Sequence, residues 1–211
     1  MVHGGEFLLM CGRYVIHDEG EVEEINKILR DIGNKYAGTG ITAKTGEIFP
    51  TNNAPVLSVQ GRKPALSLMR WGFPKWDGKG VIINAKSETA SEKKMFAKSM
   101  IQRRCVIPST GFYEWAKAKG KTKCKYQFNA TDSPMLYMAG IYTDCPSRAE
   151  DEIIAERFVI LTRAANGSVS DIHERMPVIL RKDELIRWLT DCDFADFAMR
   201  RDDTVLFKVI A

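Results

Sequence analysis

The run that says most about the architecture is Arg104-Cys105-Val106-Ile107-Pro108-Ser109-Thr110-Gly111-Phe112-Tyr113-Glu114-Trp115. Apolar and aromatic residues fill both of its halves, which predicts strands at 104–108 and 112–116. Comparable runs predict further strands at 55–60, 64–70, 81–84, 124–129, 135–143, 157–163 and 204–209. Helical periodicity predicts helices at 20–32, 88–99, 182–190 and 193–200. Because strands outnumber helices and do not alternate with them, we expect an α+β fold of mainly antiparallel, curved sheets that form a barrel-like core with peripheral helices.

Length and composition restrict the class of protein. The 211 residues, 45% of them hydrophobic, suffice for a single domain with a sizeable core, which we expect to span residues 10–211. Residues 1–9 have no periodicity and contain two adjacent glycines, so we interpret them as a removable leader, an upstream start or a cloning remnant. The net charge of +4 permits a local basic groove without requiring one.

The cysteines argue against two common kinds of site. None of the five belongs to a C-x-x-C pair and their number is odd, which disfavours a structural zinc site and a complete disulfide framework. Since no run is long enough for a secretory signal or a membrane helix, we expect a cytoplasmic protein with no membrane attachment. We also expect a monomer that uses neither a metal nor a cofactor.

Four short islands place unusual polar residues in an otherwise apolar, strand-like context. They span residues 11–14, 83–88, 108–115 and 171–177. Taken singly, each has a simple structural explanation. A lone Cys11 is usually a small core residue, and Asn84 and Ser87 could cap a helix. Glu114 could lie on the solvent side of an alternating strand, and His173 could be a satisfied histidine at the surface or in the core.

Taken together, the islands supply a nucleophile, an amide, a carboxylate and an imidazole, which are the groups that covalent catalysis on a carbonyl needs. Desolvation between two aromatic neighbours could raise the pKa of Glu114, which suits a proton shuttle. Asn84 can donate and accept hydrogen bonds at once, and His173 has the strongest context of the three histidines. We therefore expect a catalytic group made of Cys11, Asn84, Glu114 and His173.

Cys11 follows Met10 directly, and removal of everything before it would leave an α-amine and a thiol on adjacent carbons. Such an aminothiol condenses with an aldehyde, because the amine forms a Schiff base and the thiol then closes a five-membered thiazolidine ring. A free α-amine titrates near about 7.7 to 8, so a useful fraction is unprotonated at neutral pH. As written, the chain has a thiol at this position and no amine.

Tryptophans and cations gather near the same islands in sequence. The tryptophans are Trp71, Trp76 and Trp115, and the cations are Arg13, Arg70, Lys86, Arg103, Arg104 and Arg175. Aromatic rings interleaved with cations hold single-stranded nucleic acid by base stacking and phosphate contacts. On spacing alone, tryptophans that fill the core and arginines that solvate it would be the simpler explanation.

Six motifs, in order along the chain, resemble those of one known family. They are Met10-Cys11-Gly12-Arg13, Arg70-Trp71-Gly72, Asn84-Ala85-Lys86-Ser87-Glu88-Thr89, Arg104-Cys105-Val106-Ile107-Pro108, Gly111-Phe112-Tyr113-Glu114-Trp115 and His173-Glu174-Arg175-Met176-Pro177-Val178-Ile179-Leu180. They look like the SOS response-associated peptidase (SRAP) family, whose members are abasic-site processing proteins. The resemblance covers most of the chain, from Met10 to Leu180.

The resemblance implies a sensor of abasic sites in single-stranded DNA, active in the DNA damage (SOS) response through crosslinking and lyase-type chemistry. The family's N-terminal cysteine traps the aldehyde of the opened sugar as a thiazolidine. Carried over, Cys11 supplies the amine and the thiol, and Asn84 positions that N-terminus and the sugar. Glu114 shuttles protons, while His173 assists proton transfer at the sugar hydroxyl and in crosslink reversal. The residues implied to line the DNA groove are Arg13, Trp71, Lys86, Ser87, Thr162 and Arg175.

Two features depart from the family pattern. The family usually has arginine where this chain has Lys86, which keeps the charge but loses bidentate phosphate geometry. The residues before Cys11 would block the amine, so either self-cleavage by Cys11, Glu114 and His173 or ordinary methionine removal from a Met10 start must expose it. Two alternatives stay open: an N-terminal-nucleophile cysteine peptidase or amidohydrolase that does not act on DNA, and a non-enzymatic module that binds single-stranded nucleic acid. A DNA-processing protein of this kind would be nucleoid-associated when bound to DNA.

Overall fold

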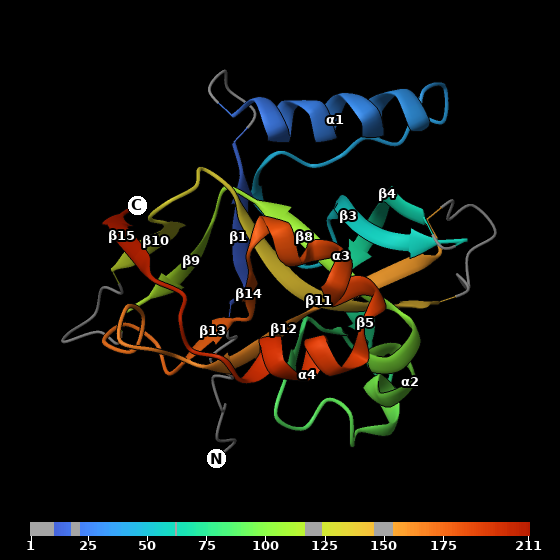
Figure 1. Ribbon diagram of the computed structural model, residues 1–211. Helices are drawn as coiled ribbons and strands as arrows, with labels where there is room; N and C mark the ends of the chain where they lie inside the picture. Colours follow the sequence, from blue (N-terminus) through green and yellow to red (C-terminus); the bar gives the residue numbers. More distant parts are fainter. Residues whose placement is uncertain (1–10, 18–21, 62, 117–123, 146–153) are drawn as a thin grey trace, which may run out of the picture.

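The computed structural model describes residues 11–17, 22–61, 63–116, 124–145 and 154–211. Its strands form a larger and a smaller sheet, and its helices lie at the periphery (Figure 1). The predicted α+β class with mainly antiparallel sheets is confirmed, and the larger sheet is partly barrel-like. The residues interpreted as a leader, 1–9, and the Met10 that follows them lie outside the described part of the chain.

The larger sheet contains a closed ring of five strands. Around the ring they are β12 (Glu156–Ala164), β4 (Lys63–Trp71), β3 (Asn53–Gln60), β8 (Arg104–Ser109) and β11 (Leu136–Asp144), which pairs back with β12. Three short strands extend it, namely β7 (Asn84–Lys86) and β13 (Arg175–Pro177) on β12, and β14 (Ile179–Leu180) on β11. The ring is tight, since a Cβ on Gly140 would clash with Ile107 Cδ1 on β8.

The smaller sheet carries the N-terminal strand in its interior. Its order is β15 (Leu206–Ile210), β10 (Lys125–Ala130), β9 (Gly111–Trp115), β1 (Arg13–Ile16) and β2 (Gly46–Ile48). A single residue, Thr110, separates β8 from β9, and its backbone N–H donates to Val15 O at 2.8 Å. The two predicted strands of the 104–115 run therefore belong to different sheets, and this run joins them. A separate two-stranded ribbon consists of β5 (Phe73–Pro74) and β6 (Val81–Ile82).

The helices cover the sheets from two sides. They are α1 (Glu23–Lys35), α2 (Lys94–Gln102), the short 3₁₀ helix Lys182–Glu184, α3 (Leu185–Thr190) and α4 (Cys192–Arg200). Figure 1 shows α1 by itself above the sheets, with α2 and α4 on the opposite side. Glu24 anchors α1, because its carboxylate accepts hydrogen bonds from Tyr137 Oη and, at 2.6 Å, from Lys182 Nζ. Arg104 ties β8 to α3 through a 2.6 Å bond from its Nε to Trp188 O.

The element boundaries differ from the predictions in a few places. The helix predicted at 88–99 begins only at Lys94, because the preceding residues form turns and no side chain caps its start. The helix predicted at 20–32 continues through Gly33 to Lys35. The short strands β1, β2, β13 and β14 were not predicted, since two to four residues carry too little periodicity.

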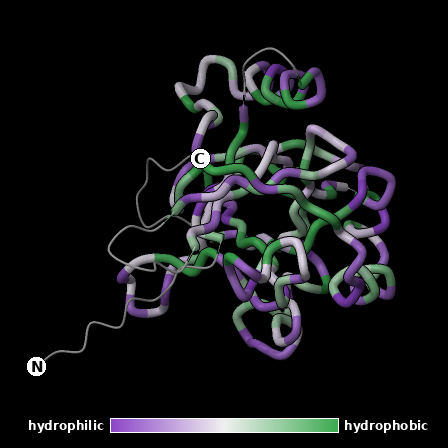
Figure 2. Tube along the Cα trace, turned by 90° about the vertical axis from the view of Figure 1, so that its left-hand side faces the viewer, coloured by the Kyte–Doolittle hydropathy of each residue, from purple (hydrophilic) through white to green (hydrophobic). Residues whose placement is uncertain are grey.

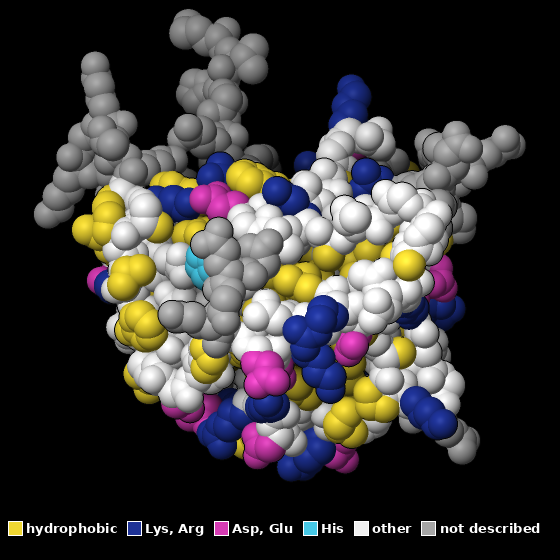
Figure 3. Space-filling model, turned by 90° about the horizontal axis from the view of Figure 1, so that it is seen from above, with side chains coloured by type: hydrophobic (Ala, Val, Ile, Leu, Met, Phe, Trp, Pro, Cys, Tyr) yellow, Lys and Arg dark blue, Asp and Glu magenta, His cyan; other side chains and the backbone are white. Residues whose placement is uncertain are grey.

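The surface mixes both signs of charge. In Figure 2 the hydrophobic parts of the trace run through the central strands, and hydrophilic stretches occupy outer turns and part of α1. Seen from the α1 side, Lys and Arg side chains are interspersed with Asp and Glu (Figure 3). None of the helices in the described residues combines the length and apolar character needed to span a bilayer.

Candidate active site

The first contact between expected site residues lies just before the start of β1, where the backbone of Cys11 meets the side chain of Glu114. The Cys11 nitrogen donates a hydrogen bond of 2.6 Å to Glu114 Oε1. The pairing of β1 with β9, which sets Arg13 opposite Tyr113, brings the two residues together although 103 positions separate them. Cys11 adopts φ +41°, a left-handed conformation that costs energy for a residue other than glycine.

Both groups of this contact are buried and have shifted pKa values. Glu114 is 2% exposed, and loss of solvation raises its pKa to about 8, although the N–H of Cys11 opposes the shift. Burial also raises the pKa of the Cys11 thiol, and the charge of Glu114 adds to that rise. The simpler explanation that Glu114 is the solvent side of its strand is therefore wrong, because Glu114 shares the inner face of β9 with Phe112.

Aromatic residues form the floor beneath this contact. The rings of Tyr14 and Trp71 meet edge-on with centroids 5.2 Å apart, and Trp71 stacks on Phe158 at 6.2 Å. Trp71 Nε1 donates to Ile83 O at 3.0 Å, directly before Asn84. Through Tyr14, Trp71 thus connects β1, which follows Cys11, to β7, whose first residue is the half-buried Asn84. The Tyr14 hydroxyl is buried and has no hydrogen-bond partner among the described residues.

Cations lie on the outer face of the smaller sheet, over aromatic rings. The Arg13 guanidinium lies 4.6 Å from the Phe49 ring centroid and 4.9 Å from that of Trp115. Lys125 Nζ lies 3.9 Å above the Tyr113 ring. Both cations also pair with the Glu47 carboxylate. Cations placed over aromatic rings are an arrangement that can hold a nucleobase and its phosphate.

His173 lies in the loop before β13, where its Nδ1 faces the backbone N and O of Arg175. Its Nδ1 is 3.1 Å from the backbone N of Arg175, which donates to it, and 3.2 Å from Arg175 O. Either tautomer of the neutral imidazole therefore finds a partner at Nδ1. Nε2 can then present a proton or a lone pair, which is the property that an acid–base group requires.

The Arg175 side chain joins three elements next to this histidine. Its Nη1 and Nη2 bind the Glu88 carboxylate at 2.5 and 2.8 Å, and Nη2 also donates to Thr162 O at 2.6 Å. Ser87 N donates to the same carbonyl at 2.8 Å, because β7 runs parallel to β12 with Lys86 beside Thr162. The guanidinium lowers the pKa of Glu88 to about 2, so its carboxylate is charged at neutral pH.

The expected site residues thus fall into two contact groups. Cys11 contacts Glu114, and β7 is linked to their floor through Trp71. Ser87, Thr162, His173 and Arg175 are joined around β12 and β13. Arg13 and Lys86 are accessible, whereas Trp71 and Thr162 are fully buried in this structure and offer no surface to a ligand.

Sequence reasoning missed some residues of these groups. Glu47 and Lys125 extend the surface around Arg13, and Tyr14 forms the floor. The alternation of charged and aromatic residues near β9 and β10 gave a weak signal for Lys125, but none for Glu47, which lies in the three-residue strand β2. Arg104 was grouped with the cations near the islands, but it is buried and binds main-chain carbonyls.

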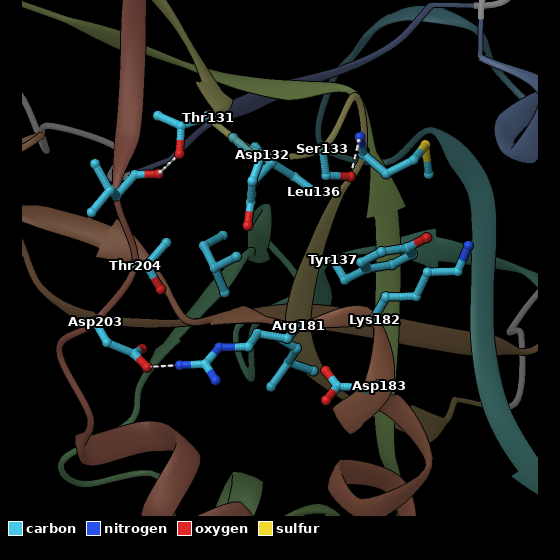
Figure 4. Close-up of a pocket in the computed structure, with 15 residues that line it drawn as sticks. Thr131, Asp132, Ser133, Leu136, Tyr137, Arg181, Lys182, Asp183, Asp203 and Thr204 are labelled. Carbon is cyan, nitrogen blue, oxygen red and sulfur yellow. Dashed lines mark hydrogen bonds and ion pairs between the residues drawn. The ribbon is translucent and has the colours of Figure 1, made fainter.

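A cavity of about 530 Å³ lies elsewhere, between the β10–β11 turn, the end of β14 and the segment before β15. Thr131, Asp132 and Ser133 form one wall and Arg181, Lys182 and Asp183 another, with Asp203 and Thr204 at a third side (Figure 4). None of the expected site residues lines it. Within the described ranges, no cluster of three or more His, Cys, Asp or Glu side chains could hold a metal ion.

Comparisons with known proteins agree with the motifs. The model of the family described as SOS response associated peptidase (SRAP) matches residues 10–202. Abasic site processing protein YoqW of Bacillus subtilis is 31% identical over 214 residues, covering 95% of this chain and 92% of that protein. Abasic site processing protein YedK of Escherichia coli is 29% identical over 181 residues, covering 85% and 79%.

A solved structure shares the fold. The crystal structure of a protein from Bacteroides thetaiotaomicron superposes with a TM-score of 0.74 at 24% sequence identity, covering 95% of this chain and 91% of that one. This likeness bears on architecture alone, and it agrees with the two-sheet arrangement described above.

Proposed function

Because this chain belongs to the SOS response associated peptidase (SRAP) family, we propose that it handles abasic sites in DNA. Relatives that match most of its length carry the name abasic site processing protein. The opened sugar of an abasic site is an aldehyde, which is the partner that an N-terminal aminothiol requires. In the proposed reaction, Cys11 captures this aldehyde in single-stranded DNA as a covalent thiazolidine and thereby shields the lesion.

The proposed reaction has two bond-forming steps. The α-amine of Cys11 attacks the aldehyde carbon to give a carbinolamine, which loses water and becomes a Schiff base. The Cys11 sulfur then adds to the carbon of the C=N bond, and the thiol proton passes to the nitrogen. One aldehyde and one aminothiol give one ring and one water, so the reaction consumes no oxidant or reductant.

One observation carries the proposal: Glu114 Oε1 lies 2.6 Å from the Cys11 nitrogen, the atom that would become the amine. A carboxyl group with a pKa of about 8 can take up and release a proton near neutral pH. Glu114 would accept a proton from the ammonium form, which frees the lone pair for attack. It would then return that proton to the hydroxyl that leaves as water.

Asn84 and His173 are assigned supporting roles. Asn84 begins β7, next to the carbonyl that Trp71 holds, and its amide would orient the new N-terminus and the sugar. The two partners at His173 Nδ1 support a role for Nε2 as acid or base at the sugar hydroxyl and in crosslink reversal. Both roles are proposals that rest on the resemblance and on these contacts.

The DNA path is proposed to follow the cations around these groups. Arg13, Lys86, Ser87 and Arg175 would contact the backbone, because phosphate contacts supply most of the affinity for single strands. Trp71 and Thr162 are fully buried, so they would support this path from below without touching the DNA. Their predicted direct contact with DNA would require a different conformation from the one described here.

Exposure of the amine is proposed to use the same contact. The Cys11 sulfur would attack the carbonyl carbon of the Met10–Cys11 peptide bond, and Glu114 would deliver the thiol proton to the departing nitrogen. The resulting thioester, hydrolysed by water, leaves a carboxylate on Met10 and frees both the amine and the thiol of Cys11. The left-handed φ of Cys11 supports this idea, because cleavage relieves the strain.

The test is a crosslinking assay with protein that begins at Cys11. We expect incubation with a labelled single-stranded oligonucleotide that carries one abasic site to give a heat-stable shifted band on a denaturing gel. Cys11→Ser should lose this band, since an amine without the thiol forms only a Schiff base that borohydride must trap. Absence of the band in wild type, or an equally stable band in the serine variant, would refute the mechanism.

The peptidase alternative makes a different prediction from the same residues. If the protein acts only on amide bonds, the full-length chain should lose residues 1–10, and a Glu114→Ala chain should not, while neither reacts with abasic DNA. Intact-mass measurement reports the cleavage and the gel reports the DNA adduct. The contact between Cys11 and Glu114 serves both reactions, so only the combined result separates them.

A further inference from the structure

The Arg175 guanidinium already holds an anion in the protein. Glu88 presents both carboxylate oxygens to Nη1 and Nη2, at 2.5 and 2.8 Å, in the fork arrangement that guanidinium also offers to a phosphate. Nη2 makes a further bond of 2.6 Å to Thr162 O. The carboxylate therefore occupies the two donors that a backbone phosphate would need.

The two partners differ in their freedom to move. The Arg175 side chain is 11% exposed and is held by the Thr162 carbonyl, whereas the Glu88 side chain is 47% exposed and projects from a turn after β7. A guanidinium this buried is unstable without a counter-charge, since an unpaired buried charge is costly. Glu88 can satisfy it without DNA and can still swing into solvent.

We propose that Glu88 is an internal competitor for the DNA backbone at Arg175, so that a phosphate group of bound single-stranded DNA replaces the carboxylate. This inference rests on the proposed function. In the DNA-free state the Glu88–Arg175 pair is neutral, and the carboxylate blocks access of other anions to the guanidinium. When a phosphate takes its place, Arg175 and the neighbouring Lys86 become one cationic site along β7 and β13.

The exchange sets a threshold for binding. An isolated anion must displace the Glu88 carboxylate from Arg175, so its net binding free energy is small. A strand that also contacts Arg13 and Lys86 brings the phosphate to Arg175 at high local concentration, so the displacement becomes favourable. Glu88 would therefore favour an extended polyanion over mononucleotides and inorganic phosphate, which makes it a specificity-determining residue.

The test compares Glu88→Gln with Glu92→Gln in binding to single-stranded DNA without an abasic site. Glu92 is exposed, lines the same surface cavity as Glu88 and loses the same formal charge on substitution. We expect Glu88→Gln to bind about 5-fold more tightly near 50 mM salt, in line with the loss of one competing surface ion pair. Glu92→Gln should gain less than about 2-fold, because solvent and salt screen an exposed charge that does not bind Arg175.

The salt dependence provides a second measurement. Because a phosphate contacts Arg175 in the complexes of wild type and of Glu88→Gln, the slope of log K against log salt should be the same for both, and for Glu92→Gln. A slope steeper by about 0.7 for Glu88→Gln would mean that Glu88 is never displaced in wild type and would overturn the proposal. Inorganic phosphate should compete more strongly with DNA on Glu88→Gln than on wild type. Equal or weaker DNA binding by Glu88→Gln would overturn the proposal and make the pair a fixed structural link.

The increase in DNA affinity caused by Glu88→Gln should also depend on Arg175. In an Arg175→Gln background, Glu88→Gln should improve binding no more than Glu92→Gln does, because the contested cation is absent. A 5-fold gain that persists there would overturn the proposal in favour of a general charge effect. All of these variants are compared with Cys11→Ser added, so that covalent trapping cannot contribute.

This design separates the inference from the function on which it rests. If wild type fails to crosslink abasic DNA while Glu88→Gln binds plain single strands more tightly, the crosslinking proposal fails and the competition stands. If wild type crosslinks abasic DNA but Glu88→Gln does not bind single strands more tightly, the proposal for Glu88 fails and the crosslinking proposal stands.

Discussion

Two glutamates of this protein, Glu114 and Glu88, have pKa values that are shifted in opposite directions. Glu114 faces the core, is 2% exposed and receives one main-chain N–H, so burial raises its pKa to about 8. Glu88 is half-exposed and faces a guanidinium, which lowers its pKa to about 2. A carboxyl group surrounded by apolar residues can exchange protons near neutral pH, whereas one held by arginine keeps its charge.

The difference shows how one fold separates proton transfer from charge recognition. The proton-exchanging carboxyl lies where β1 meets β9, inside the smaller sheet. The permanently charged carboxylate lies where β7 meets β12, on the larger sheet. If a glutamate were moved from one of these environments to the other, it would take on the other's role.

The largest effect is expected from Glu114→Gln on crosslinking by protein that begins at Cys11. Glutamine keeps an oxygen for the Cys11 nitrogen but cannot carry a proton, so the rate should fall by about 10²- to 10⁴-fold. Glu92→Gln, an exposed carboxylate change, is the control and should react as wild type. Gel-based time courses at saturating DNA measure both, and a Glu114→Gln rate within a few-fold of wild type would remove Glu114 from the chemistry.

The same substitution should make the protein more stable, and the gain should depend on pH. Glu114 has a folded pKa of about 8, above its ordinary value of 4.5, so the folded state keeps a proton that the unfolded state has lost between these values. Stability of wild type should therefore fall as pH rises from 4.5 to 8. Urea titrations should show Glu114→Gln more stable by a few kcal/mol at pH 8, at about 1.4 kcal/mol per pKa unit, with this gain absent at pH 4.5.

Glu88→Gln should change stability with the opposite sign. Its folded pKa of about 2 lies below 4.5, so its contribution is complete above pH 4.5 and is lost as the pH falls through 2. Because half of the side chain is exposed, we expect a loss of only about 1 kcal/mol at pH 7. If both Glu→Gln changes shifted the urea midpoint in the same direction at pH 8, the contrast between the two sites would be wrong.

The smallest effect is expected for Tyr14→Phe, next to the Cys11 contact. The Tyr14 hydroxyl is buried without a partner among the described residues, so its removal should leave stability unchanged or raise it by up to about 1 kcal/mol. Trp71→Phe is the matched comparison, because it loses the bond from Nε1 to Ile83 O and should destabilise the protein. A clear loss of stability in Tyr14→Phe would show that the hydroxyl has a partner.

The sequence predicted the raised pKa of Glu114, but for a different reason from the one that the structure shows. Tyr113 and Trp115 lie on the outer face of β9 beneath Lys125 and Arg13, whereas Glu114 loses its solvation on the inner face, beside Phe112. The Glu88–Arg175 pair could not be predicted in this way, since its partners are 87 residues apart. It depends on β7 pairing in parallel with β12, and the three residues of β7 carry no periodic signal for that pairing.

Trp71 shows the limit of reasoning from residue type. Its position between Arg70 and Gly72 suggested a ring for base stacking, but the ring is fully buried against Tyr14 and Phe158. Its burial follows from β1, a four-residue strand that was not predicted because its pattern is too short. The catalytic and DNA-binding roles of the expected site residues stay predictions, for which the crosslinking and binding assays above are the measurements.

The interior place of β1 in the smaller sheet also governs when the site can exist. During synthesis Cys11 emerges from the ribosome first, and Glu114 follows 103 residues later. At about 5 to 20 residues per second, this separation lasts about 5 to 20 seconds. Throughout that interval β9 is incomplete, so the Cys11 nitrogen has no carboxyl group beside it. Chain synthesis thus sets a minimum delay, because a nascent chain cannot use Glu114 on its own N-terminal region before the 103 residues that follow Cys11 have been made.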